Sequence, residues 1–517
     1  MAYKILWYSI PSLLDSSSGA AIRCKFMLEQ LSKRDIEIKV LNAAVVDDPQ
    51  GLNAIKQVRA QLQPNVAINE HSCFYQFNYD GLEYFIHNTK STEIDDLQAR
   101  EQTELFLFFT KLLEIFKPDL IMTYSADIFS TVMRAEAHAR GIPVVYALCN
   151  GSHTSFGFSD CDVVFTTSQA TSSLYKEKCN IDVAHIGNFI DASKVIAPAA
   201  QRKPTYITEI NPSPAKGIAI FVKLALAFTA KHPDLGQRFL VVKSRGNYEQ
   251  IMQSLHYADG RRVFAFPNDW DVAAAAANKP SATAAEKALF AEQLLAKKTL
   301  GLIDVAEHTN NIAAVYALSK VLVAPSLWHE SWGRVVTEAN FNGIPVLGTN
   351  HGGIYEAMGN GLGGIVLPPP KSCLQDMLML PSDEEIKPYV EALEQLLNED
   401  YSERCREASA INAMDKSVDR LYNLIKPLLD KGAQNQQHES ASFYHNLKYV
   451  EQMRLNHAAQ EAAQAQAQAQ APAQAQAPAA TLDAAPAPVS PAASTVTRAA
   501  STPAQHGKHK KNGKKKR

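Results

Sequence analysis

Two glutamates, Glu330 and Glu338, stand out in the segment VLVAPSLWHESWGRVVTEANFNGIPVLGTNHGGIYEAM. The apolar run that ends at Pro325 predicts a buried strand, followed by a loop that carries Glu330. A helix predicted to begin near Gly333 and to stop at Gly343 carries Glu338. Carboxylates placed in this way can accept hydrogen bonds from neutral polyols, the first from sugar hydroxyls and the second from a ribose diol.

Other residue types near predicted strand ends suit a diphosphate. Small residues at Ser331 and Gly333 would let backbone N–H groups at a helix N-terminus approach an anion that the helix dipole favours. Gly19, in the small-residue segment SSSGAA, follows the first predicted strand and offers the same access. Lys216 in INPSPAKG and Arg245 in VVKSRG are the cations placed to neutralise a departing diphosphate. Taken singly, charged residues mostly face solvent, so only the combination indicates a site.

Apolar runs that alternate with helical patterns must position these residues, and they form two successive series. The first contains KILWYSI, IEIKVLNA, PDLIMTYS, PVVYALCN and DVVFTTS, and the second contains TYITEIN, RFLVVKS, VLVAPS, PVLGT and GGIVLPP. The alternation predicts an α/β fold of two Rossmann-like, doubly wound domains facing a cleft, residues 1–198 and 199–432. Ligands of such folds bind at the carboxyl ends of the strands. Residues 280–298 read as a helical surface insertion, and residues 386–429 read as amphipathic helices that close the second domain.

The remaining segment, residues 433–517, has a different composition. Runs such as AQAQAQAQ and APAPVSPAAS cannot support a packed core and predict a disordered tail. The tail has ten Lys and Arg against four acids, so its net charge is +6 and that of the preceding residues is −8, for a total of −2. Its last residues, HGKHKKNGKKKR, suit an anionic membrane surface, whereas the absence of aromatic residues there argues against specific nucleic-acid binding.

The cysteines and the apolar runs of the sequence indicate in which cellular compartment the protein is expected. The seven cysteines are scattered and form no C-x-x-C pair, so the sequence predicts neither a disulfide framework nor a zinc site. The first apolar run reads as a strand and not as a signal sequence, and no run approaches the ~18 residues of a membrane span. We therefore expect a cytoplasmic protein, whose contact with a membrane, at its inner face, would be peripheral.

The segment from Pro325 to Gly353 resembles the signature of glycosyltransferase family 4. The matching positions are Pro325, Ser326, Glu330, Gly333, Glu338, Gly343, Pro345, Val346, Gly352 and Gly353. This resemblance implies the GT-B fold and transfer of a hexose-type sugar from a nucleotide diphosphate sugar to a glycan or lipid-linked acceptor. It also implies retention of configuration, no metal and no cofactor, with Glu330 on the donor sugar and Glu338 on the ribose.

Two positions depart from the family pattern, and two alternatives stay open. Many members carry an Arg shortly before the Lys that matches Lys216, where this chain has Ile210 and Asn211, and a His where it has Cys149. Nearby Asn150 or His153 is a candidate substitute for that His. The alternatives are a non-catalytic nucleotide-sugar-binding or scaffold protein and a GT-B nucleotide-sugar epimerase. Two D-x-D sequences, at residues 160–162 and 269–271, lack the context of a metal-dependent transferase.

Overall fold

The computed structural model describes residues 2–49, 51–62, 74–153, 158–243, 247–264, 274–275, 277–309 and 311–435, with a few positions between 455 and 463. Residues 1–450 form one structural unit and residues 451–517 a second. The predicted disordered tail, residues 433–517, lies almost wholly outside the described residues. The predicted domain boundaries at 198/199 and 432/433 stay predictions.

An eight-stranded sheet occupies the first part of the chain, with the order β3-β4-β2-β1-β5-β6-β7-β8. Every neighbouring pair is parallel except β3 and β4, an antiparallel hairpin at one edge. The strands are β1 (Tyr3–Pro11), β2 (Ile36–Val45), β3 (Phe74–Tyr79), β4 (Leu82–His87), β5 (Leu120–Thr123), β6 (Val144–Ala147), β7 (Val163–Thr166) and β8 (Ala184–His185). The five strands predicted in this part are confirmed, and the hairpin and the short β8 are additions.

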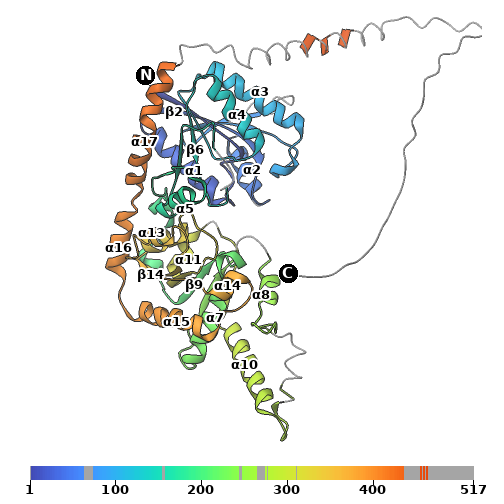
Figure 1. The fold of residues 1–517 in the computed structure, drawn as a ribbon, viewed down its shortest axis with the longest axis vertical. Coiled ribbons are helices and arrows are strands. Elements are labelled where there is room, and N and C mark those ends of the chain that lie inside the picture. The colour runs from blue at the N-terminus through green and yellow to red at the C-terminus, as the bar shows by residue number, and fades with distance from the viewer. Residues whose placement is uncertain are drawn as a thin grey trace, which may run out of the picture. The chain divides into compact units, whose positions relative to one another are not determined.

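Helices cover the first sheet on both faces (Figure 1). They are α1 (Gly19–Ser32), α2 (Gly51–Leu62), α3 (Ala99–Ile115), α4 (Ile128–Ala139) and α5 (Gln169–Cys179), with a 3-10 turn η1 (Ile94–Asp96), whereas the short α6 (Ala192–Val195) packs on helices of the second part. Helix α1 begins within the small-residue segment, at Gly19, because the Ser18 side chain caps it by accepting from the Ala21 N–H. The loop from β1 to α1 is thereby fixed at the carboxyl edge of the sheet.

A six-stranded, wholly parallel sheet follows, with the order β11-β10-β9-β12-β13-β14. Its strands are β9 (Tyr206–Ile210), β10 (Phe239–Val242), β11 (Ile303–Ala306), β12 (Ser319–Ala324), β13 (Val346–Thr349) and β14 (Gly364–Leu367). Its helices are α7 (Ile218–Lys231), α8 (Tyr248–Ser254), α10 (Ala284–Leu300), α11 (Ile312–Leu318), α12 (Arg334–Phe341), α13 (Ile354–Ala357), α14 (Lys371–Gln375), α15 (Asp383–Asn398) and α16 (Ser402–Ile411). The 3-10 turns η2 (Ala199–Gln201) and η3 (Pro214–Lys216) precede α7. The five strands predicted here are confirmed, β11 is an addition, and the α/β fold with two mainly parallel sheets is as expected.

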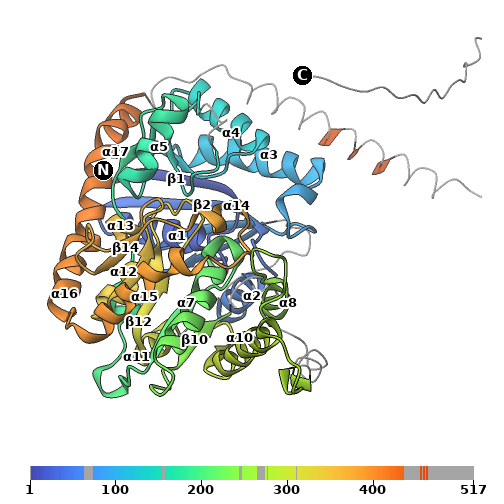
Figure 2. The ribbon, with the colours of Figure 1, turned by 60° about the horizontal axis from the view of Figure 1, so that its bottom comes forward.

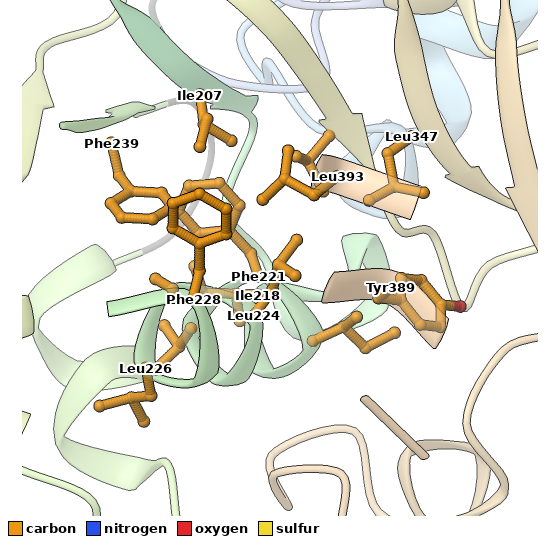
Figure 3. Packing of buried hydrophobic residues seen from close by; sticks show 14 of the residues in the cluster. Ile207, Ile218, Phe221, Leu224, Leu226, Phe228, Phe239, Leu347, Tyr389 and Leu393 are labelled. Atoms are coloured by element: carbon orange, nitrogen blue, oxygen red, sulfur yellow. The ribbon is translucent and has the colours of Figure 1, made fainter. Parts of the chain in front are cut away.

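The core of the second sheet is built around α7, which is apolar on nearly all sides because it lies between the sheet and other helices. Phe221 and Phe228 of α7 both meet Phe239 of β10 edge-on, with ring centroids 6.0 and 6.5 Å apart (Figure 3). Helix α15 lies against α7 (Figure 2), and Leu393 and Tyr389 enter the same cluster. Helix α10, the predicted surface insertion, also packs on α7 and buries Ala296.

The chain crosses between the sheets twice. The first crossing follows β8, and the second leads from α16 into α17 (Met414–Asn435), whose apolar side packs on β1 and β5 of the first sheet (Figure 1). The two crossings touch, because Arg420 donates to the Ile186 carbonyl at 3.3 Å. A Cβ on Gly187, which has a φ of 90°, would lie 2.4 Å from the Ser417 hydroxyl. Glycine is therefore required at this contact.

None of the described helices is both long and apolar enough to cross a bilayer.

Candidate functional site

A cavity of about 420 Å³ lies between the carboxyl ends of the two sheets. The loop after β1 and the residue after β6 contribute from the first sheet, and the ends of β9 and β12 contribute from the second. Of the predicted site residues, the lining includes Gly19, Lys216, Glu330, Ser331 and Gly333. The structure thus brings together five of the seven residues that the sequence placed in one site.

Lys216 and Glu330 form an ion pair inside this cavity, in which Nζ of Lys216 donates to Oε1 of Glu330. The Ser326 hydroxyl donates to the same oxygen at 3.0 Å. Both charged side chains are partly exposed, Lys216 by 31% and Glu330 by 16%, so both ends of the pair are open to a ligand. An incoming anion would compete with Glu330 for the ammonium group.

A close backbone approach holds Lys216 in place. Gly217 has a φ of 88°, and a Cβ there would lie 2.0 Å from the Pro325 carbonyl oxygen. The Ala215 carbonyl also accepts hydrogen bonds from the N–H groups of Leu327 and Trp328, at 2.9 and 3.0 Å. The loop after β9 is therefore attached to the loop after β12, and the cation and the carboxylate are positioned by one assembly.

Ser331 connects the two sides of the cavity. Its hydroxyl donates to the Cys149 carbonyl at 2.7 Å, and its own carbonyl accepts from the Thr167 hydroxyl at 2.7 Å. Gly353 donates its N–H to the Glu330 carbonyl at 2.7 Å, next to a parallel bridge between Glu330 and Gly352. A Cβ on Gly352 would lie 2.2 Å from the same carbonyl oxygen, which explains the glycine pair of the signature.

Gly333 and Glu338 belong to the start and the interior of α12. Gly333, with a φ of 89°, is the N-cap residue and directs the first N–H groups of the helix toward the cavity. Glu338 is only 3% exposed and lies behind the cavity, outside its lining. Its two oxygens accept from Arg334 Nε at 2.7 Å and from the Tyr316 hydroxyl at 2.8 Å. Arg334 itself lines the cavity, so it connects the buried Glu338 to the cavity wall.

The first sheet contributes a cation that the sequence did not single out. Arg23, on α1, lines the cavity although it is only 7% exposed, and its Nη2 donates to the Cys149 sulfur at 2.7 Å. Gly19 begins the same helix, and a Cβ there would meet no atom within 4 Å. The sequence gave no signal for Arg23. The amphipathic pattern of α1 predicts apolar residues on the buried face, and a cation there does not show which group it contacts.

Glu209 is a second lining residue that the sequence did not indicate. It is 1% exposed, and neither of its carboxylate oxygens has a hydrogen-bond partner among the described residues. Burial raises the pKa of this carboxyl well above its usual range, so the neutral form is favoured. A neutral carboxyl in the cavity wall can donate a hydrogen bond to a ligand oxygen as well as accept one.

Other predicted residues lie elsewhere or outside the described part. Arg245 lies outside the described residues, as does the D-x-D sequence at 269–271. Asn150 accepts from Ser152 and His153 is hydrogen-bonded to Tyr175, and neither lines the cavity. Asp162, from the other D-x-D sequence, accepts from the Val144 N–H at 2.9 Å and from Lys431 at 3.1 Å, which is a structural role at a strand entry.

Among the residues that the structure describes, no group of three or more His, Cys, Asp or Glu side chains is arranged to hold a metal ion. The roles predicted for the seven site residues rest on their positions and on the resemblance, and they stay predictions.

Comparisons with known proteins bear on the second sheet and on the fold. Residues 284–409, which include Glu330, Gly333 and Glu338, match the family model of glycosyl transferases group 1. A search of curated proteins with the sequence found no significant match.

Solved structures with a similar fold cover most of the chain. A glycosyltransferase from Rickettsia africae is 12% identical with a TM-score of 0.52, over 83% of this chain and 98% of that one. HepE from Anabaena, in complex with UDP, is 15% identical with a TM-score of 0.51, over 83% of this chain and 100% of that one. A trehalose-6-phosphate protein from E. coli, bound with UDP-2-fluoro glucose, is 11% identical with a TM-score of 0.50, over 83% and 99%. At these identities the likeness concerns the fold, which is that of GT-B glycosyltransferases.

Proposed function

We propose that this chain, a glycosyltransferase with a group 1 domain and the GT-B fold, belongs to family 4 and transfers a hexose-type sugar from a nucleotide diphosphate sugar to a glycan or lipid-linked acceptor. The observation that carries the proposal is the cavity, in which Lys216, Glu330 and the N-terminus of α12 converge between two sheets. Because HepE is described in complex with UDP, we place UDP first among the candidate nucleotides.

In this proposal one part of the cavity, around Lys216, binds the phosphates, and another part, around Glu330, binds the sugar. The donor diphosphate takes the place of Glu330 beside Lys216 and meets the first N–H groups of α12. Glu330, released from the lysine, then accepts hydrogen bonds from sugar hydroxyls. Arg23 and Arg245 supply further positive charge for the leaving group, and Glu338 accepts from the ribose. Stabilisation of the departing diphosphate lowers the barrier.

The remaining features of the reaction follow from the same resemblance. We propose that the sugar is transferred with retention and that neither a metal ion nor a cofactor takes part. We propose that no side chain attacks the sugar covalently, and that the departing phosphate itself removes the proton of the acceptor hydroxyl. An inverted product anomer, or activity that a chelator abolishes, would contradict this part of the proposal.

A panel of UDP-, GDP- and ADP-sugars, screened by thermal shift, tests the donor assignment. We expect one nucleotide series to raise the melting temperature of the wild-type protein and to raise that of Glu330→Gln less when the sugar is present. Glu403→Gln is the matched control, because Glu403 is 71% exposed on α16. Stabilisation of all three proteins to the same extent would exclude Glu330 from donor binding.

Three reactions of the bound donor separate the alternatives. Slow hydrolysis of the nucleotide sugar in the absence of acceptor supports a transferase, and conversion of the free donor into its epimer supports an epimerase. Binding without either reaction supports a scaffold protein.

For the tail, we propose peripheral contact with an anionic membrane through residues 507–517, which lie outside the described residues. The basic cluster would hold the enzyme at the inner face of the membrane, near a lipid-linked acceptor. Deletion of residues 507–517 is expected to abolish co-sedimentation with phosphatidylserine vesicles at low salt. Unchanged sedimentation of the truncated protein would refute this role.

A further inference from the structure

Two cysteines from different elements face each other at the wall of the cavity. The sulfur of Cys24, on α1, lies 3.9 Å from the sulfur of Cys149, which follows β6. Cys24 is fully buried, whereas Cys149 is partly exposed and lines the cavity. A small oxidant that enters the cavity therefore reaches Cys149 first and finds the second thiol directly behind it.

We propose that Cys24 and Cys149 form an oxidative modification site, in which a peroxide converts the two thiols into a disulfide and thereby alters the wall of the donor cavity. The formation of the disulfide is independent of the proposed function. Only its effect on donor binding rests on that function.

The environment of Cys149 favours its thiolate form. Arg23 is buried, donates to the Cys149 sulfur at 2.7 Å and takes part in none of the described ion pairs, so a thiolate at Cys149 can balance its charge. The hydrogen bond from Cys24 and the charge of Arg23 lower the pKa of the Cys149 thiol to about 7, although burial acts in the opposite direction. A partly exposed cysteine beside a cation is the kind that peroxides oxidise.

Cys24 has the complementary properties of a resolving thiol. Burial raises its pKa well above the usual range, so it remains protonated and does not compete for the oxidant. The sulfurs must approach from 3.9 Å to about 2.05 Å, the length of a disulfide bond. Because Cys149 lies in the loop after β6, a shift of this loop toward α1 is the shorter route to that distance.

The chemistry balances in two steps. The Cys149 thiolate attacks one oxygen of hydrogen peroxide, so that an S–O bond forms, the O–O bond breaks and the departing hydroxide is protonated to water. The Cys24 sulfur then attacks the sulfenic sulfur, so that the S–S bond forms and the S–O bond breaks. The leaving hydroxide takes the Cys24 proton as a second water. Two thiols are oxidised by two electrons, and one peroxide is reduced.

The disulfide would act on the donor cavity through two contacts of Cys149. The Cys149 carbonyl accepts from Ser331, so a shift of the loop changes the position of a residue next to Glu330. Oxidation also removes the thiolate that balances Arg23. We expect the affinity for UDP to fall by roughly tenfold or more, because displacement of a positioned group by about 1 Å is enough for large losses.

Peptide mapping of the full-length protein tests the site without any assay of activity. After treatment with hydrogen peroxide and digestion without reduction, we expect a cross-linked pair of peptides that contain Cys24 and Cys149. Trypsin is unsuitable, because cleavage after Arg23 and Lys25 leaves Cys24 on a dipeptide. In Cys24→Ser the cross-link should vanish, and dimedone should label a sulfenic acid at Cys149.

Cys161 provides the matched control. It is partly exposed, as Cys149 is, but burial raises its pKa to about 12. The Cys161→Ser protein should form the Cys24–Cys149 cross-link at the wild-type rate. If Cys161 is oxidised before any cross-link appears, the proposed site is wrong.

Titration with UDP measures the consequence for the cavity. The reduced protein should bind UDP at least tenfold more tightly than the oxidised protein, and dithiothreitol should restore the affinity. Equal affinities of the two forms would overturn the proposed effect on the cavity. Failure of the reduced protein to bind UDP would count against UDP as the nucleotide of the proposed function, while the peptide map would still decide whether the disulfide forms.

Discussion

Replacement of Glu338 by glutamine separates the proposed ribose contact from the role of this residue in the fold. In the unliganded protein Oε1 of Glu338 accepts from Arg334 and Oε2 accepts from the buried Tyr316 hydroxyl. A carboxylate has about four acceptor positions, so these two bonds leave room for a ribose diol. Glutamine keeps the shape and an oxygen acceptor but loses the charge.

The structure gives measurable expected effects on both stability and binding. The amide oxygen of glutamine can still accept from Tyr316, but its NH2 group then faces Arg334, and Glu338 is only 5% exposed, so the lost charged hydrogen bond should cost about 2 kcal/mol. For a domain of this size the melting temperature then falls by about 4–8 °C. Two hydrogen bonds from ribose to a charged group each weaken by about 1 kcal/mol when the charge is removed, so UDP affinity should fall by roughly 10- to 100-fold.

Isothermal titration with UDP and a thermal melt of the same samples provide the measurements. Tyr316→Phe is the control, because it removes one partner of Glu338 and preserves the charge. We expect this variant to lose stability but to bind UDP with nearly the wild-type affinity. If Glu338→Gln binds UDP as tightly as the wild type does, the ribose contact is refuted. An equal loss of affinity in both variants would show that the effect passes through the fold.

Three further predictions concern single residues of the cavity and its support. Gly217→Ala should lower the free energy of unfolding, measured with urea, by at least about 1–3 kcal/mol, because a Cβ there meets the Pro325 carbonyl. Gly236→Ala is the control: Gly236 has a φ of 61° and open space around it, so this change should cost only about 1 kcal/mol. Because the pKa of Glu209 is raised, the wild type loses stability as pH rises above about 4.3, the usual pKa of glutamate. The difference between the melting temperatures of Glu209→Gln and the wild type should therefore grow in favour of the variant from pH 5 to pH 8. A difference that stays constant over this range would contradict the prediction. Lys216→Met should lower kcat by about 10²- to 10³-fold in a transfer assay if this ammonium stabilises the leaving diphosphate, and an unchanged kcat would exclude that role.

The sequence predicted those parts of the fold that have a local pattern. The strands that precede Glu330 and follow Gly343 are short apolar runs bounded by turns, and the structure confirms both as β12 and β13. The convergence of Lys216 with Glu330 was expected because both follow strands of one parallel sheet. The glycine at position 352 has a reason that only the structure shows, since a Cβ there would meet the backbone of Glu330.

Partners that come from distant parts of the chain were not predictable in the same way. The amphipathic pattern of residues 414–435 indicates that one side of α17 is buried, but it does not show that the side packs on the first sheet. Nothing near Cys24 or Cys149 in the sequence indicates that α1 and the loop after β6 bring their sulfurs together. Glu209 reads as a polar residue in a strand, and only the structure shows that it is buried with no hydrogen-bond partner among the described residues.

The contact between the two crossings limits the separation of the two sheets. Because Arg420 donates to the Ile186 carbonyl where both connections pass from one sheet to the other, separation of the sheets at this point would break this hydrogen bond. We therefore expect any motion of the sheets to be a rotation about this contact, as in the hinge motions of other two-domain proteins. Asn188, next to Gly187, lines the cavity, so residues near the axis should hold nearly constant positions while those farther from it travel farthest. A larger side chain at Gly187 would shift the axis and thereby change the closed geometry without touching any ligand.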